Sequence, residues 1–308
     1  MNNNYQDLKN KVLNKDYFLN KNEGFILAVS GGPDSVFLLD LLKDFNIVVC
    51  HVNYHFRYDS QYDQNLVESY CLENNIRLEI LDLKDQKPQG NIENWAREKR
   101  YDFFKQVAKK YNFKNIVLAH HKDDFLETAL MQKEAKRNPL FFGIKEVRKE
   151  ENFIFLRPFI DLIYKNQIID LCNEKSLLFA TDYTNLQTNK YTRNKIRFEI
   201  SKLEEKDKND LYEEFLQINK NNDFKNTTIK EIYYQWKQNE FDCDFIKNQG
   251  EFINNLIFKL IHDNFKNVKL SSYKIENIKQ FLFSNNRTAK YKLNNQCFLN
   301  KVKNKLIF

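Results

Sequence analysis

The stretch FILAVSGGPDS, residues 25–35, decides the fold, because an apolar run there leads directly into two adjacent glycines. A helical pattern, VFLLDLL over residues 36–42, follows without a gap. A buried strand that turns sharply into a helix is typical of the first unit of a parallel α/β sheet. The glycines matter because the chain of 308 residues has only 6, and glycine permits backbone angles and close approaches that a side chain would block.

The same alternation of strand and helix recurs along the chain. Further strands are predicted at 47–52, 77–81, 116–119 and 153–157, and helices at 60–75, at 91–111, from 123 and from 161. This order predicts an α/β fold with a doubly wound, Rossmann-like parallel sheet. Ligands of such sheets bind beyond the carboxyl ends of the strands, where Ser30, Asn53 and His120 stand.

From about residue 206 the pattern changes. The charged residues 203–213 fit a linker or an exposed helix, and helical stretches follow at 211–219, 228–239, 251–262 and 273–283. Residues 288–308 alternate loosely around the turn-prone Asn294 and Asn295, which predicts a β-hairpin. We therefore expect two domains, a larger one over 1–205 and a smaller, mostly helical and basic one over 206–308.

Charge is distributed unevenly along the chain. There are 49 Lys+Arg and 42 Asp+Glu, a net charge of +7, yet residues 216–308 alone hold 16 basic and 8 acidic residues. That segment therefore carries +8 and the remainder −1. A basic segment beside a near-neutral body indicates contact with a polyanion, and a solvated lysine-rich surface is the equally weighted alternative. Because lysine outnumbers arginine 39 to 10, an arginine is the better clue in this chain.

Composition excludes several classes of protein. No apolar run reaches the length of a membrane span, and the N-terminal MNNNYQDLKNK has no apolar signal core. The five cysteines are scattered and form no C-x-x-C pair, which argues against a disulfide framework and a zinc knuckle. We expect a cytoplasmic protein without membrane contact, and its oligomeric state stays open, with a homodimer among the options.

The turn between the first strand and the first helix has the composition of an anion-binding loop. Its residues are Ser30, Gly31, Gly32, Pro33, Asp34 and Ser35. Such a turn can aim backbone N–H groups and hydroxyls at a phosphate, with the positive helix end behind them. It is not a Walker A loop, because the G-x-x-x-x-G-K-[ST] pattern is absent. The alternative is a tight turn in which Ser and Asp only cap the helix.

A second polar cluster, HHKDDFLET at residues 120–128, ends one strand and opens a helix. Asp124 and Glu127 stand at i and i+3 and share a helix face, where two carboxylates could bind a metal or an ammonium group. His120 or His121 could touch phosphate or act as a base. Zinc is disfavoured, because neither H-E-x-x-H nor a cysteine partner is present. Helix capping with a solvated Glu127 is the simpler alternative.

Two pairs of scarce arginines stand at helical spacing. Arg97 and Arg100 are three residues apart, and Arg193 and Arg197 are four apart. Guanidinium groups offer fixed, bidentate donors for phosphate, which lysine does not. The alternative for the first pair is surface ion pairing with Glu93 or Asp102.

These blocks resemble a known family. The loop is similar to the S-G-G-x-D-S signature of the PP-loop ATP pyrophosphatase superfamily, and the blocks in their order resemble the tRNA(Ile)-lysidine synthetase family over roughly residues 24–200. The matching segments are SGGPDS at 30–35, HVNYHFR at 51–57, ENWAREKRY at 93–101, HHKDDFLET at 120–128, DYTN at 182–185 and YTRNKIR at 191–197. The chain departs from the family pattern at Phe125 (usually Gln), Tyr54 (usually His) and Thr184 (usually Ser).

The resemblance implies an activity and its site residues. A lysine side chain would be joined to C2 of the wobble cytidine, position 34, of tRNA(Ile) with a CAU anticodon, while ATP is cleaved to AMP and pyrophosphate. Loop 30–35 would bind ATP, Asp34 would help to place Mg²⁺, and Asp124 with Glu127 would receive the lysine ammonium group. Phosphate charge would be neutralised by Arg97 or Arg100, by Arg193 and by His120, and the basic 206–308 segment would bind tRNA.

Two other functions remain open at this point. A PP-loop tRNA thiolase also adenylates a base, but it relies on paired cysteines or an iron–sulfur C-x-x-C, and neither is visible here. A tRNA-binding protein gated by nucleotide but without catalysis is the other alternative, and the intact Asp34, Asp124 and Glu127 argue against it.

Overall fold

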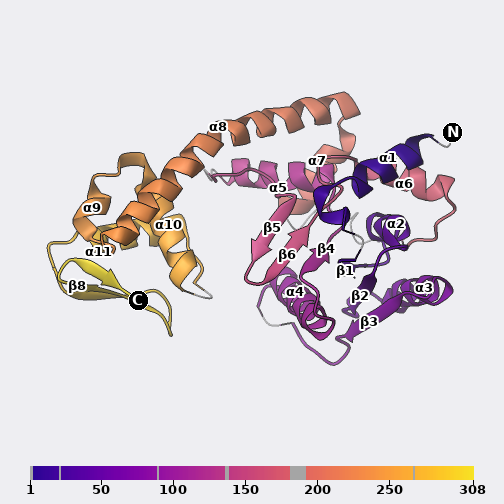
Figure 1. Ribbon diagram of the computed structural model, residues 1–308, viewed down its shortest axis with the longest axis horizontal. Coiled ribbons are helices and arrows are strands. Elements are labelled where there is room, and N and C mark those ends of the chain that lie inside the picture. The colour runs from indigo at the N-terminus through magenta and orange to yellow at the C-terminus, as the bar shows by residue number, and fades with distance from the viewer. Residues whose placement is uncertain (1–2, 21, 89, 136–138, 181–191, 266–267) are drawn as a thin grey trace. The chain divides into compact units, whose positions relative to one another are not determined.

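The computed structural model describes residues 3–308 except 21, 89, 136–138, 181–191 and 266–267. It divides into two compact units, Met1–Leu216 and Gln217–Phe308 (Figure 1). The boundary falls inside one helix, α8 (Glu205–Gln238), which begins in the first unit and continues into the second. No helix among the described residues is both long and apolar enough to cross a membrane.

A six-stranded sheet forms the centre of the first unit. Its strands are β1 (Phe25–Ala28), β2 (Ile47–Asn53), β3 (Arg77–Asp82), β4 (Asn115–Val117), β5 (Val147–Glu150) and β6 (Phe153–Leu156). Their order is β3-β2-β1-β4-β6-β5, and every neighbouring pair is parallel except β5 and β6. The charged β5 strand was not predicted, because VRKE at a sheet edge lacks the apolar run of a buried strand.

Helices cover both faces of this sheet, which confirms the predicted doubly wound α/β fold. The helices of this unit are α1 (Asn3–Leu13), α2 (Pro33–Leu42), α3 (Ser60–Glu73), α4 (Ile92–Lys110), α5 (Lys122–Glu134), α6 (Lys165–Glu174) and α7 (Thr192–Lys202). Alternate side chains of β1 enter different cores, as a pleated strand requires: Phe25 and Leu27 pack with α1, α2 and α6, whereas Ile26 packs with α4.

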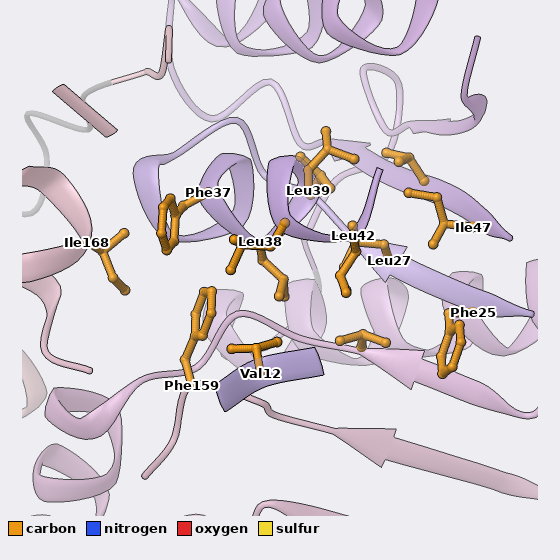
Figure 2. Close-up of a cluster of buried hydrophobic side chains, with 14 of the residues drawn as sticks. Val12, Phe25, Leu27, Phe37, Leu38, Leu39, Leu42, Ile47, Phe159 and Ile168 are labelled. Atoms are coloured by element: carbon orange, nitrogen blue, oxygen red, sulfur yellow. The ribbon is translucent and has the colours of Figure 1, made fainter. Parts of the chain in front are cut away.

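The larger core explains why the helix after the glycine loop is so apolar. Phe37, Leu38 and Leu42 of α2 belong to one buried cluster with Leu27 of β1 and Val12 of α1 (Figure 2). All five side chains are fully buried. Burial of one such side chain stabilises the fold by about 1.5–3 kcal/mol. The loop that precedes α2 is therefore attached to the most deeply packed part of the unit.

The second unit is mostly helical with a small sheet. After α8 come α9 (Cys243–Lys247), α10 (Ile253–Asn264), α11 (Ser272–Phe283), β7 (Ala289–Lys292), β8 (Phe298–Val302) and β9 (Lys305–Ile307). The two helices predicted at 211–219 and 228–239 are one continuous helix, and its beginning includes the charged 205–213 stretch. The predicted hairpin is a three-stranded antiparallel sheet, because Lys303 and Asn304 both adopt positive φ and form a second tight turn.

Lys301 is an unusual buried charge in this unit. Its side chain is fully buried, and its amine donates hydrogen bonds to the carbonyl oxygens of Phe281 at 3.0 Å and Ser284 at 3.1 Å. It also reaches the Ser284 hydroxyl at 2.9 Å. These carbonyls end α11, where unpaired C=O groups and the negative end of the helix dipole favour a cation. Burial lowers the pKa of Lys301 from its usual value.

Candidate active site

The glycine loop lies between β1 and α2, as predicted. Gly31 has a φ of +93°, and a Cβ atom there would lie 3.2 Å from both Cβ and the carbonyl oxygen of Asp63. Glycine is therefore needed for its conformation and for space. Gly32 precedes the first turn of α2 and Pro33 begins it, a position at which proline's missing N–H costs nothing.

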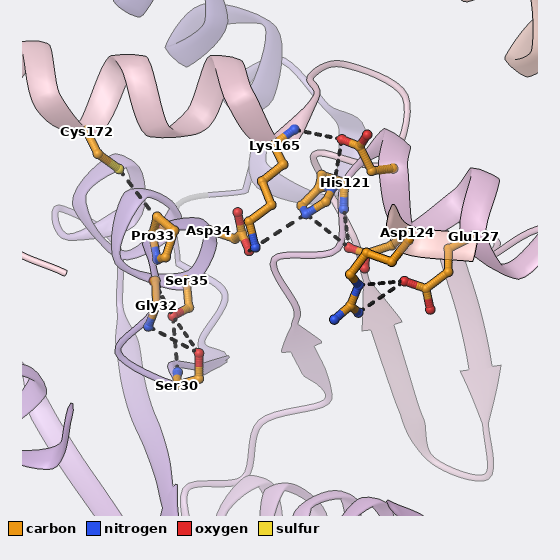
Figure 3. Close-up of polar contacts among 12 residues, drawn as sticks. Ser30, Gly32, Pro33, Asp34, Ser35, His121, Asp124, Glu127, Lys165 and Cys172 are labelled. Carbon is orange, nitrogen blue, oxygen red and sulfur yellow. Dashed lines mark hydrogen bonds and ion pairs between the residues drawn. The ribbon is translucent and has the colours of Figure 1, made fainter. Parts of the chain in front are cut away.

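Two serines hold this loop in shape. The Ser35 hydroxyl donates to the carbonyl oxygen of Gly32 at 2.9 Å and accepts from the Ser30 backbone N–H at 3.1 Å (Figure 3). The Ser30 and Ser35 hydroxyl oxygens are 3.2 Å apart. The serines fix the turn before any ligand arrives, so the backbone needs little rearrangement to receive an anion.

His121 lies among three carboxylates at the start of α5. Its imidazole nitrogens are 3.7 Å from Asp34, 3.5 Å from Asp123 and 3.5 Å from Asp124 (Figure 3). Burial opposes the charged form, but the carboxylates outweigh burial and raise the pKa of His121 to about 10. The pKa values of Asp123 and Asp124 are lowered in turn, although burial alone would raise them. A protonated His121 therefore links Asp34 of the glycine loop to Asp123 and Asp124 at the start of α5.

One carboxylate oxygen of Asp34 is buried without a hydrogen-bond donor among the described residues. Oδ1 is buried and makes no hydrogen bond with any residue that the structure describes. Oδ2 is 3.6 Å from the amine of Lys165 and 3.7 Å from His121. A buried acceptor without a donor is unfavourable, so a bound cation or donor at Oδ1 would be stabilised.

Two adjoining cavities open at this edge of the sheet. The larger, of about 420 Å³, is lined by the loop, by the ends of β1, β2 and β4, and by α4 and α5, with Ser30, Asp34, Tyr54, Arg100, His120 and Asp124 on its wall. The smaller, of about 140 Å³, contains Glu127, Lys165 and Lys208. Asp34, Asp124 and Arg197 border both cavities, so one ligand in each would meet at these side chains.

His120 lies on the wall of the larger cavity. Burial, with help from the charges of Arg157, Arg100 and Arg97, lowers the pKa of His120 to about 4. Its imidazole is therefore neutral at pH 7. A neutral ring would meet phosphate as a hydrogen-bond donor and not as the cation that the sequence suggests.

Asp124 and Glu127 lie on α5 as the i, i+3 spacing predicts, but each already has partners. Asp124 accepts the His121 backbone N–H at 3.0 Å. Glu127 is only 2% exposed and pairs with both Arg193 and Arg197; its Oε2 is 3.0 Å from an Arg197 nitrogen. Arg193 and Arg197 thus face one helical carboxylate, and Arg197 alone of the two lines the cavities.

The other arginine pair is divided by the structure. Arg100 lines the larger cavity, whereas the exposed Arg97 lies over the Tyr101 ring at 4.5 Å and donates to its hydroxyl at 3.2 Å. Glu93, the partner suggested for this pair, instead binds Arg193. Of Arg97 and Arg100, therefore, it is Arg100 that can meet a ligand in this cavity directly.

Phe125, which stands where the family usually has Gln, is part of the hydrophobic core. It is 2% exposed and packs against Tyr212, with ring centroids 4.8 Å apart. A Cβ on Gly143 would lie 2.5 Å from the same ring. The side chain therefore belongs to the core behind α5 and does not line either cavity.

Lysines that the sequence did not single out also border the site. Lys208, near the start of α8, is 4% exposed, and its amine is 2.8 Å from Asp123. Lys165 begins α6 and reaches Asp34. In a chain with 39 lysines no local pattern marks these two, because the contacts join residues 85 and 131 positions apart. The motif residues Asp182, Tyr183, Thr184, Asn185 and Tyr191 lie outside the described residues.

The five cysteines are all described, and all are free thiols. Cys50 lines the larger cavity, and burial, with the charge of Glu79, raises its pKa well above the usual range. Burial raises the pKa of Cys71 to about 12. Burial also raises the pKa values of Cys172 and Cys243, so none of these four buried cysteines has the low pKa that marks a catalytic thiol.

Comparison with known proteins places the chain. Residues 1–204 match the family of PP-loop domains. The tRNA(Ile)-lysidine synthase of Mycoplasmopsis pulmonis is 44% identical over 283 residues, which cover 90% of this chain and 96% of that protein. The tRNA(Ile)-lysidine synthase of Mesomycoplasma hyopneumoniae is 34% identical over 288 residues, 92% of this chain and 95% of that one.

A solved structure agrees at the level of the fold. The U34-tRNA thiolase NcsA from Methanococcus maripaludis superposes with a TM-score of 0.57 at 14% identity, covering 70% of this chain and 78% of that chain. At that identity the likeness shows a shared fold alone. The sequence matches confirm the resemblance drawn from the motifs, and they extend it beyond residue 204. The chain belongs to the tRNA(Ile)-lysidine synthase family of PP-loop proteins.

Proposed function

We propose that this protein ligates lysine to C2 of the wobble cytidine in tRNA(Ile) with a CAU anticodon and converts ATP to AMP and pyrophosphate. Family membership supports lysidine formation on tRNA(Ile) with ATP as the second substrate. The observation that carries the residue-level proposal is that Asp34 of the phosphate loop and Asp124 of α5 border both cavities. The cytidine, adenylated in the larger cavity, would therefore lie next to a lysine bound in the smaller one.

The chemistry has two steps. O2 of the cytidine attacks the α-phosphorus of ATP, the bond to the β-phosphate oxygen breaks, and pyrophosphate leaves. The lysine side-chain amine, after losing a proton, attacks C2. The C2–O2 bond then breaks, and AMP departs with that oxygen. Activation is needed because a carbonyl oxygen is a poor leaving group, whereas a phosphate ester oxygen is a good one.

Cations on the wall of the larger cavity suit the phosphates of ATP. Loop 30–35 would hold them by its backbone N–H groups and hydroxyls, with the N-terminus of α2 behind. Arg100 and Arg197 line the cavity and would stabilise the negative charge that develops at the α-phosphate. Arg97 and Arg193 line neither cavity and would add positive charge from further away, and the neutral His120 would donate a hydrogen bond.

Asp34 would help to hold Mg²⁺. Its Oδ1 is buried and has no hydrogen-bond partner among the described residues. This suits Mg²⁺, which is usually bound by one or two carboxylates together with substrate phosphates. Bound there, the ion would neutralise charge on the pyrophosphate leaving group.

Asp124 and Glu127 would receive the lysine ammonium group. Both border the smaller cavity, whose size of about 140 Å³ suits an amino-acid side chain better than a nucleotide. Glu127 is already held by two guanidinium groups, so an incoming ammonium group would exchange with one of them. The released arginine would then be available to ATP.

The second unit would bind the tRNA body. Lys290 and Lys292 are exposed on one face of β7, because alternate residues of a strand point the same way. Replacing both by alanine should weaken tRNA binding and reduce the slope of log Kd against log salt by up to about 2, since each phosphate contact contributes about 0.9. ATP binding should not change. An unaltered salt slope would argue against this surface.

One assay separates the proposed activity from its alternatives. The protein is incubated with radiolabelled lysine, ATP and a CAU-anticodon tRNA(Ile) transcript, and label in the tRNA is counted. Incorporation that requires ATP supports the ligase. No incorporation by a folded protein that binds both tRNA and ATP would support a non-catalytic binder. Pyrophosphate release without lysine incorporation would favour a thiolase, although the buried cysteines argue against one.

A further inference from the structure

An exposed aromatic group lies at the rim of the larger cavity, and the reaction scheme above does not use it. Phe56 is 50% exposed although it is a large apolar side chain. Its ring stacks on that of Tyr54, with centroids 5.4 Å apart and planes 17° apart, and it leans on Trp95 at 6.1 Å. Tyr54 itself lines the cavity. The stack therefore runs from the cavity wall to solvent.

The backbone around this stack is held firmly. The segment follows β2, and His55 has a φ of +54°, which few residues other than glycine adopt. The Asn53 side chain accepts the His55 N–H at 3.1 Å, and the His55 ring is 2.9 Å from Asp82. The Tyr54 hydroxyl donates to a carbonyl oxygen of α4 at 3.0 Å. The half-exposed Phe56 ring is thus presented by a fixed turn and not by a loose loop.

Positive charge accompanies the aromatic rings. Lys99 lies over the Trp95 ring at 5.9 Å, and Arg100 on the same helix lines the cavity. Flat aromatic rings flanked by cations suit an unpaired nucleobase, whose face stacks while its phosphates meet the cations. A purely apolar protein partner would gain nothing from these charges.

We propose that Phe56, supported by Tyr54, is a stacking platform for the adenine that follows the wobble cytidine in the CAU anticodon. This inference rests on the proposed function, because it needs the cytidine to enter the cavity beside Tyr54. A cytidine that leaves its stack exposes the faces of its neighbours, and the adenine offers the largest of these in a CAU anticodon. Phe56 replaces the loop neighbour that the adenine loses.

The test uses the full chain and a tRNA(Ile) assembled from RNA fragments, in which 2-aminopurine replaces the anticodon adenine. The fluorescence of 2-aminopurine falls when its ring stacks. Binding should quench the fluorescence with the natural protein and with Phe56→Tyr. Phe56→Ala should remove the quenching and weaken tRNA binding by about tenfold, the effect typical of one lost base stack. Phe56→Leu keeps apolar volume without an aromatic face and should behave as Phe56→Ala.

The outcomes discriminate between occupants. Unchanged quenching in Phe56→Ala overturns the proposal, and a fully active Phe56→Leu would show that mere apolar contact suffices and would overturn it too. A raised Kd for ATP with unchanged tRNA binding would assign the platform to the adenine of ATP instead. Lysine incorporation by the natural protein tests the ligase separately. If that fails, the proposed function fails; if it succeeds without a Phe56 effect, only the platform fails.

Discussion

Glu127→Gln tests whether this carboxylate of α5 binds the ammonium group of the substrate lysine. The substitution keeps the shape of the side chain and removes its charge. A hydrogen bond to a charged group is worth about 1.5–3 kcal/mol, so losing the ammonium contact should lower kcat/KM for lysine by about 100-fold, equivalent to about 2.7 kcal/mol. Adenylation, followed as pyrophosphate release from ATP and tRNA, should change little, because Glu127 lines only the smaller cavity.

The structural cost of this variant should be modest. Breaking a buried ion pair by removing one partner costs about 3–5 kcal/mol when the other charge stays buried. Here the side chains of Arg193 and Arg197 are 36% and 41% exposed, so water can solvate the freed guanidinium groups. We expect a loss of about 1–2 kcal/mol in the free energy of unfolding, measured by urea titration.

Glu93→Gln is the matched control. Glu93 is the exposed second partner of Arg193 and lines neither cavity. Its loss should alter kcat/KM for lysine by less than threefold. If Glu127→Gln also stays within threefold, the ammonium site is elsewhere. If it instead raises KM for ATP with KM for lysine unchanged, Glu127 serves only to position the arginines.

Three further predictions follow from the described contacts. Because the folded pKa of His121 lies near 10, its contribution to stability is complete below about pH 6.5 and is lost as pH rises towards 10. Between pH 7 and 9 the natural protein should therefore lose about 2–3 kcal/mol more unfolding free energy than His121→Gln, measured by urea titration at both pH values. Lys208→Met should lower the unfolding free energy by about 1–3 kcal/mol, because it removes the amine 2.8 Å from Oδ1 of the buried Asp123, and a change below 0.5 kcal/mol would contradict this. Phe125→Gln should lower it by about 3–5 kcal/mol, since the amide would replace a ring packed against Tyr212, and improved lysine affinity in this variant would contradict the packing role.

The catalytic half of the fold was predictable because its local signals agree. In SGGPDS the strand, the turn glycines and the apolar helix all favour one βαβ start, and the structure places that turn at the carboxyl edge of a parallel sheet. The same agreement located His120 and Asp124 at the end of β4. Helical spacing fixed which residues share a face, and the side chains of Asp124 and Glu127 do lie together on the smaller cavity.

What the sequence could not predict depends on long-range partners. Spacing placed Arg193 on a helix but could not say that it would meet Glu127, 66 residues away, and Glu93, 100 residues away. The short charged edge strand β5 forms because β6 offers it a partner and not because of its own residues. The charged residues at the beginning of α8 fit a linker as well as a helix. They form a helix because residues such as Phe215 pack against the rest of the first unit.

The buried amine of Lys301 can report on local opening of the second unit. Acylating reagents attack exposed, unprotonated lysine amines, and this one is enclosed by the end of α11 while most other lysines lie at the surface. Its rate of labelling therefore measures how often the second unit opens. A mass-spectrometric time course that follows the peptide containing Lys301 would record that opening without an introduced probe. Labelling of the buried Lys208 would measure opening of the first unit in the same way.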